Sequence, residues 1–438
     1  MNNPFIHTIT SIDPSIRNRS IAEMAKTIPY RDWIDVCAEL ENFRHASDNL
    51  YERVRACMFL AHIYRFYLME APETARAGLL PYQAYEHILN RRFEEGLKLL
   101  LDSVKQKGID GALCSAIAQC YRDLTFETLT DQVRKSVRAS LGNQWMFRIG
   151  YAMDHPIRIR RELTTPDEQT SLYPILCERT PVRLDLSHSG WSDIFFLGMD
   201  YPEGAQVLNI SVDLGVYGRD EISKPPIETY VRILDEPILR LTSIDLECTK
   251  DIHNLEGLFN FGNDYLGLLK AGIISSGFIP PSFEGTGQPL ERILEQVVGR
   301  GMGLELVTKG NDIPKGSRLA VSTNLLASII AVLMRATGQT AQFLGTLDED
   351  SRRIVASRAI LGEWLGGSGG GWQDSGGIWP GIKKIYGVEA TESDPEFGIS
   401  KGRLLPKHDV WSSEKVHEVK DKLAQSLVLI HGGMAQNV

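Results

Sequence analysis

The sequence lacks the features that mark membrane-spanning, secreted and nucleic-acid-binding proteins. Its longest apolar run, residues 325–334, stops at Arg335 and is too short for a bilayer-spanning helix, which needs about 20 residues. The start of the chain has no basic patch followed by an apolar stretch, so no secretory signal is predicted and the expected location is the cytoplasm. A net charge of −9 disfavours nucleic acid or an anionic membrane surface as the main partner.

Cysteine is also scarce. Six cysteines stand among 438 residues, with no CxxC pair and no paired spacing. Disulfide frameworks and cysteine-based metal clusters need such spacings, so we predict neither and expect a reducing compartment. The rest of the composition, 43% hydrophobic and 24% charged, is that of a globular protein long enough for two or three domains.

Glycine is nearly absent from the first part of the chain. Residues 1–176 hold 6 of the 39 glycines, and the acidic and basic residues of this stretch cancel. The remainder holds the other glycines and carries the entire net charge of −9. This shift predicts two bodies: a helical domain with its connector at 1–176 and a second domain at 177–438.

The first body is predicted to be helical. Apolar residues recur at three- and four-residue steps between Tyr85 and Val104, and Gly108 stands where a helix would stop. Residues 50–70 are rich in aromatics and are the candidate for a central buried helix. Nothing in this body suggests catalysis, so we predict a packing module that docks another domain or subunit.

The second body mixes the two periodicities. Alternation of apolar and polar residues predicts antiparallel strands at residues 205–214, 228–235 and 239–246. Helical periodicity follows at residues 253–271, 288–299, 322–337 and 348–364. Because the strands cluster first and the helices come later, the predicted fold class is α+β.

A strand-like stretch near the start of this body ends in a turn with a carboxylate. Residues 179–193 read RTPVRLDLSHSGWSD, which places Arg183, Asp185 and Asp193 around a Gly-Trp-Ser turn. An ionised carboxylate at such a turn can accept hydrogen bonds from sugar hydroxyls. The alternative, that Asp193 only caps the turn or a helix start, stays open on local evidence.

Residues 314–324 (PKGSRLAVSTN) lead straight into the apolar stretch 325–334. A loop that enters a helix N-terminus suits an anion, because unpaired N–H groups and the helix dipole both point there. Ser322 and Thr323 offer hydroxyl ligands for a phosphate-bound Mg²⁺; the alternative is that one of them is only an N-cap. The loop does not match the Walker pattern.

Residues 363–377 (EWLGGSGGGWQDSGG) contain seven glycines in fifteen residues. Trp372, Gln373 and Asp374 stand inside the run, which argues against the alternative of a flexible linker. Glycine lets the backbone approach a ligand closely, and Asp374 supplies a carboxylate at the end of the loop.

Together these stretches resemble the GHMP kinases, in particular the fucokinase-like and heptose-kinase-like sugar kinases. Fucokinases carry an R-V-D-L-x-G-G-W-S-D opening, a P-K-G-S-G-L-G-T-S-S phosphate loop and a G-G-G-W-Q-D-Q loop, and this chain has RLDLSHSGWSD, PKGSRLAVST and GGGWQDS in the same order. The resemblance covers about residues 177–438, and GGGWQD is its most specific part. It implies a two-lobed GHMP-kinase-like domain that uses ATP and Mg²⁺ to phosphorylate a monosaccharide.

The resemblance also implies roles for single residues. Asp374 falls on the catalytic aspartate, which takes the proton of the acceptor hydroxyl or orients it, and Arg183 falls on the basic residue beside it. Glu363 and Ser322 fall on metal-binding positions. The nucleotide-binding positions are Pro314, Lys315, Gly316, Ser317, Arg318, Ser322 and Thr323, and the sugar-binding positions are Asp193, Trp191, Gly370 and Gly371.

The chain departs from the fucokinase pattern in four places. Arg318 and Ala320 stand where the phosphate loop has glycine, and each side chain opposes a left-handed backbone by about 1–2 kcal/mol. The opening motif is one residue longer between Leu186 and Trp191, and Ser375 replaces a glutamine. The sequence ends before the family's carboxy-terminal glycine-rich motif, so we expect either that it is a piece of a longer protein or that part of the kinase fold is missing. These departures keep a second reading open, a kinase-derived binding or scaffold module without catalysis.

Overall fold

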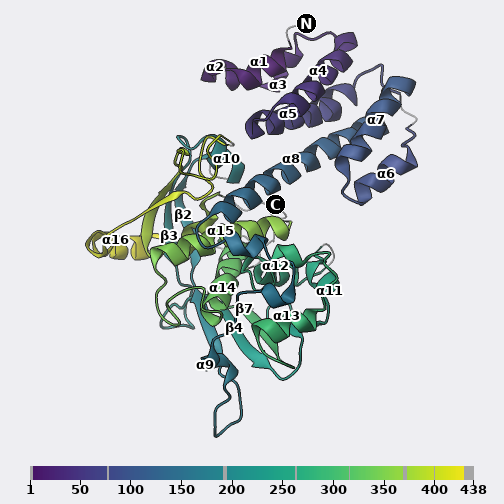
Figure 1. The fold of residues 1–438 in the computed structure, drawn as a ribbon. Coiled ribbons are helices and arrows are strands. Elements are labelled where there is room, and N and C mark those ends of the chain that lie inside the picture. Colours follow the sequence, from purple (N-terminus) through teal and green to yellow (C-terminus); the bar gives the residue numbers. More distant parts are fainter. Residues whose placement is uncertain are drawn as a thin grey trace. The chain divides into compact units, whose positions relative to one another are not determined.

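The computed structural model (Figure 1) describes residues 3–75, 78–190, 195–261, 264–314, 316–367, 372–398 and 400–428. Contacts divide the chain into two compact units, Met1–Gln132 with Gly398–Ser400 and Val133–Phe397 with Lys401–Val438. Residues 133–176 therefore pack with the second unit. The division into functional domains at residue 176 stays a prediction from composition.

The first unit is helical throughout its described residues. Its elements are α1 (Pro4–Thr10), α2 (Pro14–Arg17), α3 (Ile21–Ala25), η1 (Tyr30–Asp32), α4 (Trp33–Ala46), α5 (Leu50–His62), the π-helical turn η2 (Ile63–Leu68), α6 (Tyr82–Leu89), α7 (Phe93–Lys107) and α8 (Gly111–Ala139), which continues past the unit boundary. Aromatic and thiol side chains stand out in its core: Phe5, Trp33, Cys37, Cys57, Phe59, Tyr64, Cys114, Cys120 and Tyr121. Burial raises the pKa of the Cys57 thiol to about 11 and those of Cys114 and Cys120 to about 12, so these thiols serve as small apolar groups.

The helical expectations for this unit are confirmed in outline. Residues 50–70, predicted to be a central buried helix, form α5 and η2. The apolar period between Tyr85 and Val104 is shared by two helices, because Arg91 interrupts it with a φ of +57° between α6 and α7. Gly108 ends α7 with a φ of +83°, a conformation that glycine adopts without strain.

Residues 140–165 run along the second unit and are held by its side chains. They contain η3 (Gln144–Phe147), η4 (Ala152–Asp154) and α9 (Arg161–Thr164). The guanidinium of Arg358, on α15 (Glu349–Leu365), is fully buried and donates to Oδ1 of Asn143 at 2.6 Å. Arg160 donates in turn to the carbonyl of Arg335 at 2.9 Å. This stretch is therefore part of the second unit's core rather than a loose tether.

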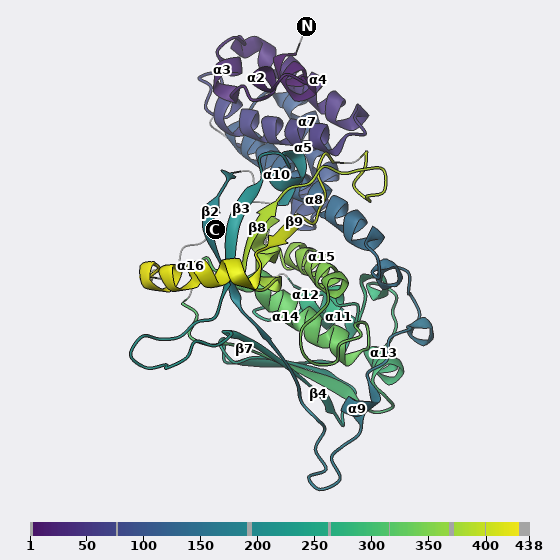
Figure 2. The same ribbon diagram turned by 90° about the vertical axis from the view of Figure 1, so that its left-hand side faces the viewer.

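A five-stranded sheet forms one half of the second unit. Its strand order is β1 (Leu176–Thr180), β4 (Ile227–Leu234), β7 (Gly303–Gly310), β5 (Leu239–Ser243) and β6 (Cys248–Ile252). Neighbouring strands are antiparallel except β5 and β7, which are parallel. Helices α12 (Gly267–Ser275), α13 (Leu290–Val297) and α14 (Val321–Ala336) lie over one face (Figure 2) and share a continuous core with the strands.

A four-stranded antiparallel sheet forms the other half. Its strand order is β2 (Val182–His188), β3 (Gln206–Val212), β8 (Ile382–Tyr386) and β9 (Lys407–Val410). The short helix α10 (Phe195–Asp200) and the 3₁₀ turn η7 (Trp372–Ile378) pack in one cluster with Ile385 of β8. The remaining elements are α11 (Leu255–Phe259), η6 (Pro281–Phe283) and α16 (Ser413–Ser426).

The α+β prediction is confirmed. The three predicted strands are β3, β4 and β5, and the predicted helices at 288–299, 322–337 and 348–364 are α13, α14 and α15. The helix predicted at 253–271 is divided into α11 and α12. Strands β1, β6, β7, β8 and β9 were not predicted. β7 begins and ends with glycine and β8 has two adjacent lysines, which interrupt the alternation that signals a strand.

Candidate active site

The turn η7 carries Asp374 and is fixed by close packing on three sides. A Cβ at Gly377 would overlap the side chain of Asn324 on α14, and a Cβ at Gly376 would come within 2.7 Å of Oδ1 of Asn209 on β3. Trp372, at the start of the turn, is fully buried against Gly198 of α10. Gly376 and Gly377 therefore let this turn pack closely against α14 and β3, which a flexible linker would not do.

Arg183 of β2 forms ion pairs with two carboxylates, one of which is on this turn. Its guanidinium donates to Oδ1 of Asp374 and forms a second ion pair with Asp185 on its own strand. Arg183 and Asp374 are 7% and 8% exposed, so the pair is almost withdrawn from water. Asn209 donates to Asp185 at 2.9 Å and extends the network across the sheet. The predicted partnership of Arg183 and Asp374 is thus a direct contact in the structure.

Glu363 and Thr323 meet on two facing helices. Glu363 lies near the end of α15, Thr323 in the first turn of α14, and the threonine hydroxyl donates to Oε1 of Glu363 at 2.7 Å. Both side chains are fully buried. A carboxylate and hydroxyls, including that of the neighbouring Ser322, are the hard oxygen donors that Mg²⁺ prefers, so these residues fit the predicted ion by their chemistry.

In the loop before α14, every second residue has a left-handed backbone conformation. Gly316, Arg318 and Ala320 have φ values of +73°, +58° and +53°, and Ala320 is the residue that opens α14. Alternating left-handed residues turn successive N–H groups toward one side, as in anion-binding nests. The two positions where fucokinases have glycine therefore keep the glycine-like conformation, at a cost of about 1–2 kcal/mol for each non-glycine residue. The amide of Arg183 donates to the carbonyl of Leu319 at 3.2 Å, which ties the loop to β2.

This loop forms one wall of a cavity of about 690 Å³. The other walls are largely apolar, and the polar groups gather at the loop and at the ends of β5 and β7. The lining comprises Ile227, Ser243, Asp245, Leu246, Tyr265, Leu268, Leu269, Lys309, Gly310, Ile313, Pro314, Gly316, Ser317, Arg318, Leu319, Ala320, Val321, Ser322 and Leu325. Five of the seven predicted nucleotide-binding residues line it. Thr323 does not line the cavity; its side chain is buried and hydrogen-bonded to Glu363.

The buried lysine Lys383 on β8 was missed by sequence reasoning. It donates to Oγ of Ser211 at 2.9 Å and to the carbonyl of Gly381 at 3.0 Å. Burial, with the positive charges of Arg183 and Arg352, lowers the pKa of Lys383 to about 7. Asn209 was missed as well. The signal for both was polar residues at inward positions of the apolar strands β3 and β8.

Five of the predicted site residues lie outside the described part of the chain: Trp191, Asp193, Lys315, Gly370 and Gly371. Their roles stay predictions from the resemblance. The remaining predicted residues form two groups, the pair on β2 and η7 and the set on the phosphate loop and the facing helices, and these groups adjoin where Gly377 of η7 meets Asn324 of α14.

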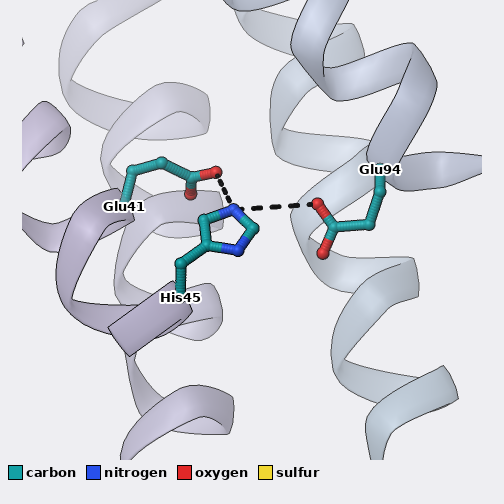
Figure 3. A group of neighbouring side chains, drawn as sticks. All are labelled: Glu41, His45 and Glu94. Atoms are coloured by element: carbon teal, nitrogen blue, oxygen red, sulfur yellow. Dashed lines mark hydrogen bonds and ion pairs between the residues drawn. The ribbon is translucent and has the colours of Figure 1, made fainter. Parts of the chain in front are cut away.

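A different cluster in the first unit has the spacing of a metal site. Among the described residues, Glu41 and His45 of α4 and Glu94 of α7 bring their ligand atoms within 4.8 Å of one another (Figure 3). The guanidinium of Arg44 donates to both carboxylates through four hydrogen bonds of 2.7–2.8 Å. Arg44 thus already occupies all four carboxylate oxygens that a cation would need and offsets part of their charge, so we interpret the cluster as an ion-pair network.

Comparisons with known proteins agree with the resemblance. No family model matches the chain. It is 28% identical over 254 residues to the L-fucokinase/L-fucose-1-P guanylyltransferase of Bacteroides fragilis, and 26% identical over 209 residues to the bifunctional fucokinase/GDP-fucose pyrophosphorylase of Arabidopsis thaliana. These matches cover 57% and 46% of the chain but 24% and 16% of the relatives, so the chain spans about a quarter or less of their length.

Solved kinase structures are similar at low scores. A mevalonate kinase matches 56% of the chain and 59% of its own length with 14% identity and a TM-score of 0.32. The galactokinase of Lactococcus lactis matches 57% and 56% with 15% identity and a TM-score of 0.31. In the described residues, no helix has both the length and the apolar character needed to cross a membrane. The predicted resemblance to GHMP-type sugar kinases is confirmed by the sequence relatives.

Proposed function

We propose that the second unit transfers the γ-phosphoryl group of ATP to a hydroxyl of a monosaccharide, as the fucokinases that it resembles are named to do. The observation that carries the proposal is the contact of Arg183 with Asp374, packed beside the Thr323–Glu363 pair at the N-terminus of α14. These four side chains come from four elements between residues 182 and 378, and each falls on a position that the resemblance assigns to catalysis, nucleotide or metal.

Asp374 would act on the acceptor. Its carboxylate would orient the attacking hydroxyl and accept its proton as the O–P bond forms, while Arg183 holds Oδ1 and keeps the carboxylate in place. The close packing of Gly376 and Gly377 leaves the turn little freedom. Phosphoryl transfer depends on such positioning and on charge neutralisation more than on covalent catalysis.

The phosphate loop and the facing helices would act on ATP. N–H groups of residues 316–320 would cradle phosphate oxygens at the N-terminus of α14, and the apolar walls of the cavity would accept the base. Glu363 and the hydroxyls of Ser322 and Thr323 would hold Mg²⁺. When bound, this ion would neutralise charge on the transferred phosphate.

A second candidate function, a binding or scaffold module without catalysis, is favoured by one observation. Arg318 and Ala320 hold left-handed conformations in the loop, where side chains can hinder the close approach of a triphosphate. The helical unit would then be the working part, and in either case we propose that it docks another domain or subunit. The sequence relatives do not favour this candidate.

The test is a coupled assay of ADP release by the full chain with Mg·ATP and a panel of monosaccharides, including 6-deoxyhexoses such as L-fucose and phosphorylated heptoses. Sugar-dependent ADP release is the expected result. A folded chain that binds Mg·ATP but releases no ADP with any sugar would support the scaffold candidate instead.

A further inference from the structure

A β-bulge interrupts β2 at Leu186, directly before the stretch in which the opening motif is one residue longer. Asp185 pairs with Asn209 of β3, whereas Ser187 pairs with the next residue along, Leu208, so Leu186 is the residue without a partner position. A bulge of this kind re-aims the side chains that follow it.

The bulge brings a histidine onto the face of the sheet that carries the candidate site. Residues opposite each other on neighbouring strands share a face, so Asp185 lies with Asn209. After the bulge His188 lies opposite Val207, which is two residues from Asn209 and on the same face. Without the bulge, Ser187 would take this place and His188 would point to the other face.

On that face His188 contacts the residue that precedes Asp374. The side-chain amide nitrogen of Gln373 lies 3.0 Å from Nε2 of the His188 ring. An amide nitrogen only donates, so Nε2 accepts and the ring proton resides on Nδ1, which makes Nδ1 a donor. His188 is exposed, whereas Gln373 is 3% exposed and its carbonyl oxygen has no hydrogen-bond partner in the structure. A buried amide thus sets the orientation and the tautomer of an exposed imidazole.

We propose that His188 contacts the acceptor sugar and helps to select it, with Gln373 as the positioning residue. The proposal rests on the proposed function, because it is Asp374 that makes this the acceptor side of the site. Nδ1–H of His188 donates to a hydroxyl oxygen of the sugar other than the one that is phosphorylated. Gln373 links the selection of the sugar to the phosphoryl transfer, because it directly precedes Asp374 in the chain.

The test is specificity measured with monodeoxy sugars. Each hydroxyl of the best acceptor is removed in turn, and kcat/KM is compared for the wild type, His188→Ala and His188→Asn. One deoxy analogue should be about 10-fold poorer for the wild type, the effect of one good hydrogen bond. His188→Ala should lose about the same factor on the intact sugar through KM and no longer distinguish that analogue. His188→Asn, whose amide nitrogen can replace Nδ1–H, should restore part of the discrimination.

Two further variants separate selection from stability. Gln373→Leu should reduce the same discrimination and change the ring ¹⁵N shifts of His188, a signature that lost packing alone would not produce. His253→Ala, at an exposed histidine directly after β6 of the five-stranded sheet, is the matched control and should behave as the wild type. The KM for Mg·ATP should stay within about 2-fold in every variant, because the phosphate loop is unchanged.

The result that would contradict the role of His188 differs from the result that would contradict the proposed kinase function. If His188→Ala keeps the full discrimination between intact and deoxy sugars, the role of His188 is wrong while kinase activity stands. If the wild type phosphorylates no sugar, the proposed function fails, and calorimetric titration of the sugars then decides on His188 by itself. Sugar binding that is absent, or that His188→Ala leaves unchanged, would overturn the role.

Discussion

Each unit of the chain buries an arginine between two carboxylates, and the two clusters differ in what surrounds them. In the first unit Arg44, 3% exposed, satisfies Glu41 and Glu94 and ties α4 to α7. In the second, Arg183, 7% exposed, pairs with Asp185 and Asp374. Burial and ion pairing are the same in both, so neither property identifies a catalytic site.

The difference lies in the position of the carboxylates. Both carboxylates of Arg44 project from regular helices, and every oxygen of the two accepts from the guanidinium. Asp374 instead lies on a turn whose Gly377 packs against α14, the helix that the phosphate loop enters, and whose Gly376 packs against β3. We infer that the Arg44 cluster holds helices together, whereas the Arg183 cluster holds a reactive group in place.

The largest effect is expected from Asp374→Asn. If this carboxylate orients or deprotonates the acceptor hydroxyl, turnover should fall by about 10²–10⁴-fold, while Mg·ATP binding changes little. Steady-state kinetics measure the turnover, and calorimetry measures the binding of Mg·ATP. Glu94→Gln, in the other cluster, is the control and should leave turnover unchanged. Near-normal turnover of Asp374→Asn would remove the residue from the mechanism.

The converse is expected for Arg44→Met. Leaving two carboxylates without their arginine should lower the free energy of unfolding by about 2–4 kcal/mol, somewhat below the range for fully buried pairs because the Glu94 side chain is 46% exposed. Denaturant unfolding of the full chain, followed by a probe in the helical unit, measures it. Arg92→Met, at an exposed pair with Glu95, should cost less than about 0.5 kcal/mol. If Arg44→Met also lowers turnover while the chain is folded, the Arg44 cluster would not be purely structural and the distinction between the two clusters would be wrong.

Above neutral pH, a pH effect on stability is expected from Lys383, which lies close enough to Arg183 to feel its charge. Because the pKa of Lys383 is lowered to about 7, the unfolded chain binds more protons than the folded chain between about pH 7 and pH 10.5. This residue should therefore make the fold more stable as pH rises through that window, by up to about 1.4 kcal/mol per pH unit. Lys383→Met should flatten the profile, and Lys384→Met, at its exposed neighbour, should not.

The smallest effect is expected in the phosphate loop. Arg318→Gly with Ala320→Gly should keep or slightly tighten Mg·ATP binding, because the backbone cost of about 1–2 kcal/mol per residue is relieved in the free and the bound chain alike. If Arg318 is itself a phosphate ligand, the same change should weaken binding, and salt should do so as well. Ser171→Gly, which relieves a φ of +56° in an exposed loop, is the control. Calorimetry distinguishes the outcomes.

The sequence predicted the parts of the site that are local, and it missed those that depend on pairing. GGGWQD and PKGSRLAVST are short motifs, and the turn that carries Asp374 and the entry of the loop into a helix follow from residues within and beside them. The left-handed conformations of Arg318 and Ala320 do not follow from the sequence, because both side chains oppose them. The contact of Arg183 with Asp374 joins positions 191 residues apart, so only the resemblance to known kinases could anticipate it. Lys383 and Asn209 could not be placed because their burial depends on the register of β8 against β3. The bulge at Leu186 could not be placed for the same reason, because it is defined by the register of β2 against β3.

The central claim, that the Arg183 cluster catalyses transfer to a sugar and the Arg44 cluster does not, is tested most directly by one product measurement. Wild type, Asp374→Asn and Arg44→Met are incubated with Mg·ATP and the monosaccharide panel, and ³¹P NMR detects sugar phosphate. The account predicts sugar phosphate from the wild type and from Arg44→Met at a temperature where it is folded, and at most about a hundredth of that rate from Asp374→Asn. Sugar phosphate formed equally by Asp374→Asn, or by none of the three while the folded wild type binds Mg·ATP, would contradict it.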